Sequence, residues 1–143
     1  MKKILLFLFA ILLTFTVYQS NPYCGEEGSI LNVDNIIKNV DPEKITKAEF
    51  KEYFKTIEGK KAKGEGIVVN VLYGGKDRYR ITVLTTASEP EKGYNVVLFT
   101  IQDAHSELKQ NDKIIFEGQV QRINPYKGAS IDLQGNYKKV GEK

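Results

Sequence analysis

The segments GEGIVVNVLY (residues 64–73) and RYRITVLTT (residues 78–86) decide the fold of this chain. Both are rich in β-branched side chains, and in the second segment charged or hydroxyl residues alternate with apolar ones. A period of two residues is typical of β-strands that bury one face. The glycines of the short connection, residues 74–77, predict a turn and therefore a hairpin. We expect Ile81 and Val83 to face the core and Arg80 and Thr82 to face water.

Three further segments downstream have the same character. YNVVLFTI (residues 94–101) is apolar on both faces, which predicts a central strand. KIIFEGQVQRI (residues 113–123) alternates and carries Gly118 where a bulge or sharp coil is expected, and ASIDLQG (residues 129–135) is a fifth strand. One helical turn around residues 106–109 is expected between the third and fourth strands. The chain of 143 residues, 41% hydrophobic and 27% charged, is therefore expected to form one domain with one core.

Helical periodicity precedes the strands. Thr46 followed by Glu49 is a capping box, and the apolar residues behind it recur on one side of a helix that Gly59 ends. These apolar residues are Phe50, Tyr53, Phe54 and Ile57. An earlier helix capped by Ser29 is expected to end before the Asp41-Pro42 pair.

Five short strands with a helical connection between the third and fourth are the pattern of an OB-fold, a five-stranded Greek-key barrel. The stretch LKQNDKIIFEGQV (residues 108–120) has the residue pattern that is common in the fourth strand of OB domains. The stretch KAKGEGIVV (residues 61–69) resembles the start of the first strand of such domains. The chain from about residue 44 to residue 140 resembles the small exported proteins of the tRNA_anti-like OB family. This resemblance implies a mainly β fold preceded by one or two helices. It implies neither tRNA binding nor catalytic residues.

The first residues have the pattern of an export signal. Lys2 and Lys3 precede an uncharged run of 15 residues, 4–18. A helix of that length spans roughly 22 Å, which is short of the roughly 30 Å core of a bilayer. We expect cleavage near Ser20 and a location in the periplasm or cell envelope. Because Tyr18 is bulky for a cleavage site, an uncleaved anchor in the inner membrane stays open.

These patterns divide the chain into an export segment (residues 1–20), a tether with the N-terminal helices (residues 21–61) and an OB-fold domain (residues 62–143). Cys24, the single cysteine, lies in the tether and has no partner for an intramolecular disulfide. It is free, paired between chains, or lipidated, although the residues before it do not match a lipobox.

No catalytic or metal site, and no cofactor, is predicted. His105 is the single histidine and has no second histidine or nearby cysteine to complete a zinc site. Asp77 lacks a second carboxylate in its neighbourhood, so a metal-dependent nuclease is not favoured. A hydrolase would need a cluster of carboxylates that the sequence does not suggest.

Cations and one aromatic ring are expected near the usual ligand face of an OB-fold and in its two adjoining loops. This combination would suit single-stranded nucleic acid or an oligosaccharide. An ordinary solvated strand face stays the alternative, because the 21 basic and 18 acidic residues nearly balance once Lys2 and Lys3 are removed. The candidate ligand-binding residues are Lys76, Arg78, Arg80, Arg122, Tyr126 and Lys127.

The sequence therefore predicts an exported, non-enzymatic OB-fold binding module of the cell envelope with an unidentified ligand or envelope protein as partner. One alternative is an envelope structural or assembly protein that contacts a membrane-anchored partner through residues 29–58. Another, less favoured, is a binder of polyanions or single-stranded nucleic acid.

Overall fold

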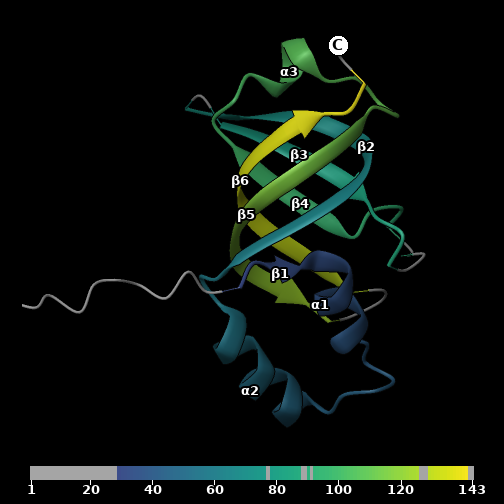
Figure 1. Cartoon of the computed structure of the whole chain (residues 1–143), viewed down its shortest axis with the longest axis vertical. Coiled ribbons are helices and arrows are strands. Elements are labelled where there is room, and N and C mark those ends of the chain that lie inside the picture. Colours follow the sequence, from purple (N-terminus) through teal and green to yellow (C-terminus); the bar gives the residue numbers. More distant parts are fainter. Residues whose placement is uncertain (1–28, 77, 88–89, 91, 126–128, 142–143) are drawn as a thin grey trace, which may run out of the picture.

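The computed structural model describes residues 29–76, 78–87, 90, 92–125 and 129–141. The predicted export segment and Cys24 lie outside these residues. The predicted strands are present as β2 (Lys61–Gly75), β3 (Arg78–Leu84), β4 (Val96–Thr100), β5 (Lys113–Asn124) and β6 (Ser130–Lys139). The predicted helical turn is α3 (Ala104–Glu107), which lies at one end of the barrel (Figure 1).

The sheet order is β2-β3-β4-β6-β5, and β5 pairs with β2 again, so the sheet closes into a barrel. β4 and β6 are parallel, whereas the other pairs in the barrel are antiparallel. Placing the last strand between the third and the fourth makes this a Greek-key arrangement. The fold is the predicted five-stranded OB barrel. In β4, Val96, Val97 and Leu98 are buried, whereas Phe99 is half-buried, so the strand is not covered on both faces along its whole length.

The N-terminal segment starts differently from the prediction. Leu31 and Asn32 form β1 (Leu31–Asn32), which pairs in parallel with Ala62 and Lys63 of β2. The helix α1 (Val33–Asn39) therefore begins after this pairing, and its cap is Asn32 rather than Ser29. The Asn32 side chain accepts a hydrogen bond from the backbone N–H of Asn35 at 3.1 Å. Pairing of β1 with the edge of β2 displaces the start of the helix.

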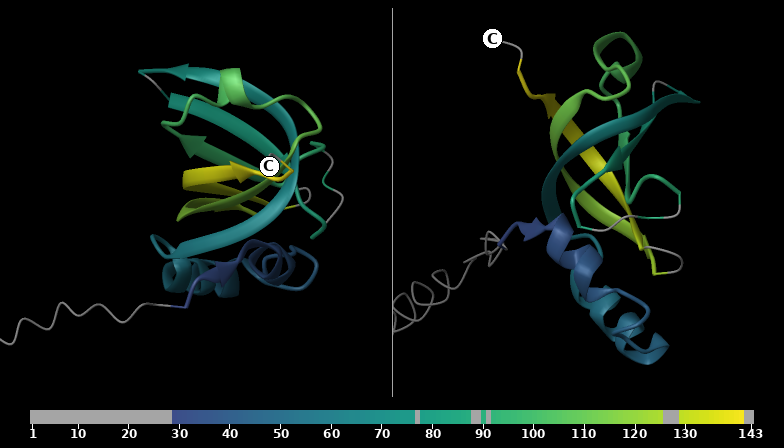
Figure 2. Two further views of the ribbon diagram at one scale, coloured as in Figure 1. Left: turned by 45° about the horizontal axis from the view of Figure 1, so that its top comes forward. Right: turned by 90° about the vertical axis from the view of Figure 1, so that its right-hand side faces the viewer.

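Helix α1 contributes to the barrel core. Val33, Ile36, Ile37 and Val40 are all buried and belong to the same apolar cluster as the inward side chains of the strands. The segment from β1 through α1 thus covers the barrel end opposite α3 (Figure 2). The predicted boundary at residue 61 separates helices from strands in the sequence, but the hydrophobic core extends across it.

Helix α2 (Lys47–Ile57) has the predicted capping box. The Thr46 hydroxyl accepts from the Glu49 backbone N–H at 3.3 Å, and the Glu49 carboxylate accepts from the Thr46 N–H at 2.9 Å. Along its apolar side only Ile57 is buried, whereas Phe50 and Phe54 are half-buried with their ring centroids 6.2 Å apart. Within the described part of the chain, no helix combines the length and the apolar character needed to cross a membrane.

Gly118 does not occupy a bulge. It pairs with Gly135 of β6, and a Cβ on Gly118 would lie 2.8 Å from the carbonyl oxygen of Gln134. The glycine therefore permits the close approach of β5 and β6, and the irregularity in their register lies between Val120 and Arg122. Thr82 also differs from the prediction, because it is buried and donates a hydrogen bond to the Asn70 carbonyl at 3.3 Å, next to a bulge in β2.

Candidate ligand-binding face

A ladder of directly paired residues runs around the outside of the barrel. Residues that are Cα partners on neighbouring strands project from the same face of a sheet. The successive partners, from β2 through β3, β4, β6 and β5 back to β2, are Leu72, Arg80, Phe99, Gln134, Gln119 and Lys61. All six are exposed or half-buried, which places this ladder on the outer surface.

A surface hollow of about 390 Å³ lies beside the middle of this ladder. Its volume is within the range of small-molecule sites. Phe99 is half-buried in the hollow, and Ile101 beside it is 76% exposed although it is apolar. The lining residues are Arg78, Phe99, Thr100, Ile101, Gln121, Gln134, Gly135 and Asn136. We call this hollow, together with the ladder positions Arg80 and Gln119, the ligand face.

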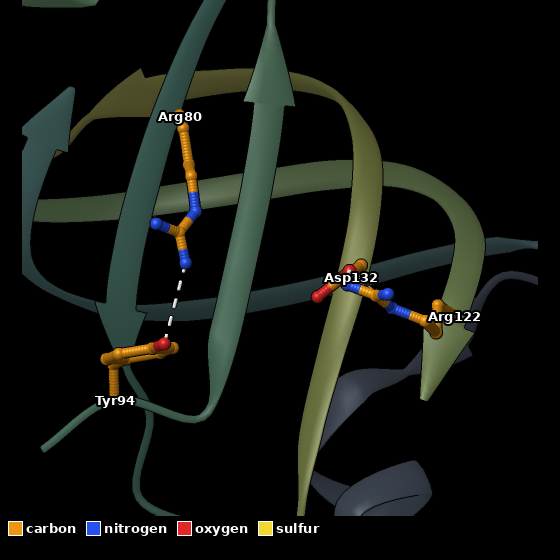
Figure 3. A network of polar contacts seen from close by, with 4 residues as sticks. All are labelled: Arg80, Tyr94, Arg122 and Asp132. Atoms are coloured by element: carbon orange, nitrogen blue, oxygen red, sulfur yellow. Dashed lines mark hydrogen bonds and ion pairs between the residues drawn. The ribbon is translucent and has the colours of Figure 1, made fainter. Parts of the chain in front are cut away.

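Two of the predicted cations reach the ligand face. Arg78 lines the hollow and is exposed. Arg80 is the cross-strand partner of Phe99, and one of its terminal nitrogens lies 3.5 Å from the Tyr94 hydroxyl, a long hydrogen bond (Figure 3). Lys76 is exposed on the β2–β3 turn with a φ of 51°, two residues before Arg78. The first hairpin thus presents three predicted residues on one side of the barrel.

Arg122 is exposed, but its guanidinium is paired with a carboxylate. It lies on the next row of the sheet and pairs with Asp132 of β6 (Figure 3). Its Nη2 and the Asp132 Oδ2 are 2.8 Å apart, and its Nε donates to the same oxygen at 3.0 Å. Because this carboxylate compensates the guanidinium charge, Arg122 adds little positive potential to the ligand face. Tyr126 and Lys127 lie outside the described residues.

The bulge in β5 places two consecutive side chains, Gln121 and Arg122, on the outside of the barrel. Val120 pairs with Leu133 and Arg122 pairs with Asp132, so Gln121 is the extra residue between them. It is exposed and lines the hollow. Alternation from Gln119 already places Gln121 outside, and the bulge turns Arg122 outward as well. Gln121 therefore joins Gln134 and Asn136 of β6 to give three carboxamides around one hollow.

A second hollow of about 580 Å³ lies between the start of α2 and the end of β5. Pro42, Ile45 and Phe50 contribute apolar surface from the helical side. Ile123 and Pro125 contribute apolar surface from the barrel side, and Lys47 and Arg122 also line the hollow. Arg122 lines this second hollow, whereas its neighbour Gln121 lines the hollow of the ligand face.

The titratable groups around α3 serve the local structure. Asp103 caps α3 by accepting from the Ser106 backbone N–H at 3.3 Å, and hydrogen bonds from Ser106 and Tyr79 lower the pKa of its carboxyl. Burial and the nearby Glu107 raise the pKa of Tyr137, whose hydroxyl donates to the Glu107 carboxylate at 2.6 Å. His105 is exposed on this helix. No group of three His, Cys, Asp or Glu side chains that could hold a metal ion occurs among the described residues.

Sequence reasoning missed most of the hollow. Phe99 lies in a strand that is apolar on both faces, so periodicity could not tell which apolar side chains point outward. The carboxamides of Gln121, Gln134 and Asn136 carry no charge and form no motif in the sequence. The register of β4 with β6 brings them together with Phe99. Among the lining residues, only Arg78 had a feature in the sequence that marked it as a candidate, which is its charge in a strand with alternating polarity.

No family model matches the chain, and neither does any curated protein. Among solved structures, the chain is similar to three OBodies bound to hen egg-white lysozyme, with 18%, 16% and 17% sequence identity. Each similarity covers 62% of this chain and 82%, 88% and 86% of the OBody chain, with TM-scores of 0.42, 0.42 and 0.41. The fold assignment rests on the strand order and closure described above.

Proposed function

We propose that this protein is an exported, non-enzymatic binding module of the cell envelope whose ligand docks on the ligand face. The observation that carries the proposal is the hollow of about 390 Å³ with Phe99 in it and the exposed Ile101 beside it. Exposed apolar surface in a concave site, ringed by a few polar groups, is typical of ligand pockets.

The side chains in the hollow favour binding over catalysis. Gln121, Gln134 and Asn136 offer paired donors and acceptors, and Arg78 offers a cation. A carboxamide is neither a nucleophile nor a proton-transfer group at neutral pH, so these residues hold a ligand by hydrogen bonds without activating it. The envelope location rests on the two lysines and the apolar run of residues 4–18.

The location is tested by expressing the full chain in a bacterial host, separating the fractions and measuring the intact mass. Loss of roughly the first twenty residues, with recovery in the soluble envelope fraction, is expected for a cleaved export signal. A full-length protein in the membrane fraction would support an uncleaved anchor. A full-length protein in the cytoplasm would contradict export.

The binding role is tested by titrating isotope-labelled protein with three probes: chitohexaose, an oligothymidylate and an acidic peptide. Backbone amide shifts are expected to concentrate at Phe99, Gln134 and their neighbours for at least one probe. Phe99→Ala should weaken that binding. Ile115→Ala is the matched control, because Ile115 is also an exposed apolar residue but lines a different hollow. Binding that is equally sensitive to both variants, or the absence of shifts on the ligand face with every probe, would contradict the proposal.

A second candidate is an envelope assembly protein that contacts a partner through its helical end. The second hollow favours it, because Ile45 and half-buried Phe50 leave apolar surface beside α2. Removing residues 29–58 would be a poor test, since Val33 and Ile36 belong to the barrel core. Ile45→Asp should instead abolish co-purification of an envelope partner while leaving the melting temperature nearly unchanged. Unchanged co-purification would contradict this candidate.

A further inference from the structure

We infer that the ligand face selects a neutral oligosaccharide and discriminates against polyanions such as single-stranded nucleic acid. This inference rests on the proposed binding function and names the chemical class of its ligand. It follows from three properties of the same surface: the number of carboxamides, the apolar platform beside them, and the small number of arginines that reach the ligand face, Arg78 and Arg80.

The carboxamides match hydroxyl groups. Each Gln or Asn side chain carries two N–H donors and an acceptor oxygen, and a sugar hydroxyl can donate and accept at once. Gln121, Gln134 and Asn136 line the hollow, and Gln119 is the cross-strand partner of Gln134. All four are exposed, so their hydrogen-bonding groups are available at the surface. The phosphates of a nucleic acid only accept hydrogen bonds, so they would use the N–H donors of these side chains and leave their acceptor oxygens unused.

The apolar platform matches the face of a sugar ring. The C–H groups on one side of a pyranose form an apolar surface, and burying such surface against an aromatic ring is favourable. Phe99 is half-buried and lines the hollow, and Ile101, at 76% exposed, extends this surface from the end of β4. The carboxamides of β5 and β6 then lie on one side of the platform, since Phe99 and Gln134 are direct partners.

The arginines are arranged unfavourably for a polyanion. Affinity for nucleic acid comes largely from several cations that replace the counterions of the phosphates. The Asp132 carboxylate at 2.8 Å compensates the charge of Arg122, whereas Arg80 donates only a long hydrogen bond of 3.5 Å to the neutral Tyr94 hydroxyl. Arg78 is the one cation in the described lining of the hollow. With Arg80 beside it, the ligand face carries two arginines, which can position a ligand but do not provide a track for many successive phosphates.

The test compares chitohexaose with an oligothymidylate on the full mature chain, by calorimetry and by amide shifts at low and high salt. Chitohexaose is expected to bind with an affinity that changes little with salt, and Gln134→Ala should weaken it about three- to tenfold, as expected for one lost hydrogen bond. Gln110→Ala is the matched control, because Gln110 is an exposed glutamine in the turn before β5.

Three results would overturn the inference. If the oligothymidylate shifts the Phe99 and Gln134 amides with an affinity that falls steeply with salt, while chitohexaose shifts neither, the face is a polyanion site and the proposed binding function still stands. If chitohexaose binds but Gln134→Ala and Gln110→Ala weaken it equally, the saccharide binds elsewhere. If no probe, including the acidic peptide, shifts the ligand face, the inference and the proposed function both fail.

Discussion

Arg122 and Asp132 are cross-strand partners, and two nitrogens of the guanidinium converge on one oxygen, Asp132 Oδ2. The Asp132 side chain is only 12% exposed, whereas that of Arg122 is 75% exposed. A carboxylate that is largely buried needs a cation close by, because an unpaired charge there would destabilise the folded state. The pair therefore compensates one cation next to the ligand face, at a residue that lines the hollow beside α2.

Asp132→Asn is expected to free Arg122 and to strengthen binding of an oligothymidylate about threefold at low salt, because one more uncompensated cation would face the ligand. Fluorescence anisotropy with a labelled oligonucleotide measures this change. Asp112→Asn is the control, since it also removes one acidic partner, that of Lys139, at the turn before β5. An equal gain in both variants would show that net charge alone matters and would contradict a specific role for the Arg122–Asp132 pair.

Ile36→Ala is expected to lower the free energy of unfolding of the whole domain by about 2–5 kcal/mol, because Ile36 of α1 is buried in the barrel core. Chemical denaturation followed by circular dichroism measures this loss. Ile30→Ala, at a position that is 43% exposed, should change stability by less than about 0.5 kcal/mol. If Ile36→Ala leaves the barrel transition unchanged, α1 is not an integral part of the barrel.

Gly135→Ala is expected to cost about 1–3 kcal/mol, because an added Cβ would collide with the Glu117 carbonyl oxygen and the Gly118 Cα. Both contacts are with backbone, so relief requires β5 and β6 to separate. Thermal unfolding measures the effect. At Gly74 the nearest atom to an added Cβ is 3.4 Å away, so Gly74→Ala should be close to neutral. A similar loss in both variants would argue against a close approach of β5 and β6 at Gly135.

Thr46→Ala is expected to destabilise the domain by about 1 kcal/mol, because the Glu49 backbone N–H loses its acceptor at the start of α2. The comparison is Thr56→Ala in the same helix, where the exposed hydroxyl donates to the Tyr53 carbonyl and caps nothing. Urea titration of the two variants measures the difference in their free energies of unfolding. Equal stability of both would mean that the start of α2 is frayed in solution.

Acid is expected to weaken the turn that precedes β5. The Lys109 backbone N–H and the Lys139 ammonium group hold the pKa of Asp112 below its ordinary value of 3.8. A lowered pKa in the folded state stabilises the fold above the ordinary pKa, and this contribution disappears as the pH falls through the folded-state value. Asp112→Asn should therefore lower the melting temperature at pH 7 and converge with the wild-type chain near pH 2. A constant difference across that range would contradict this role.

The strands were predictable because each carries its own signal. Alternation places Ile81 and Val83 in the core, as found, and the Thr46–Glu49 capping box is a local interaction between residues three positions apart. Ser29 was predicted wrongly as a cap because β1 pairs with a segment about thirty residues away. Thr82 was predicted to face water because alternation gives the face of a strand on which a side chain lies, but not whether neighbours such as its buried partner Val97 leave that side chain exposed.

The candidate site, like the fold, was predictable only where its residues carry a local signal. Local patterns determined the elements, their order and the charged hairpin with Arg78 and Arg80, because hydrophobic period and turn chemistry act between residues close in the chain. The tertiary structure decided which charges remain available and which neutral groups meet. Asp132 compensates Arg122, and Phe99 meets Gln134, only because β6 inserts between β4 and β5. Such contacts depend on the register between strands, which is set by closure of the barrel and packing of its core rather than by any single segment.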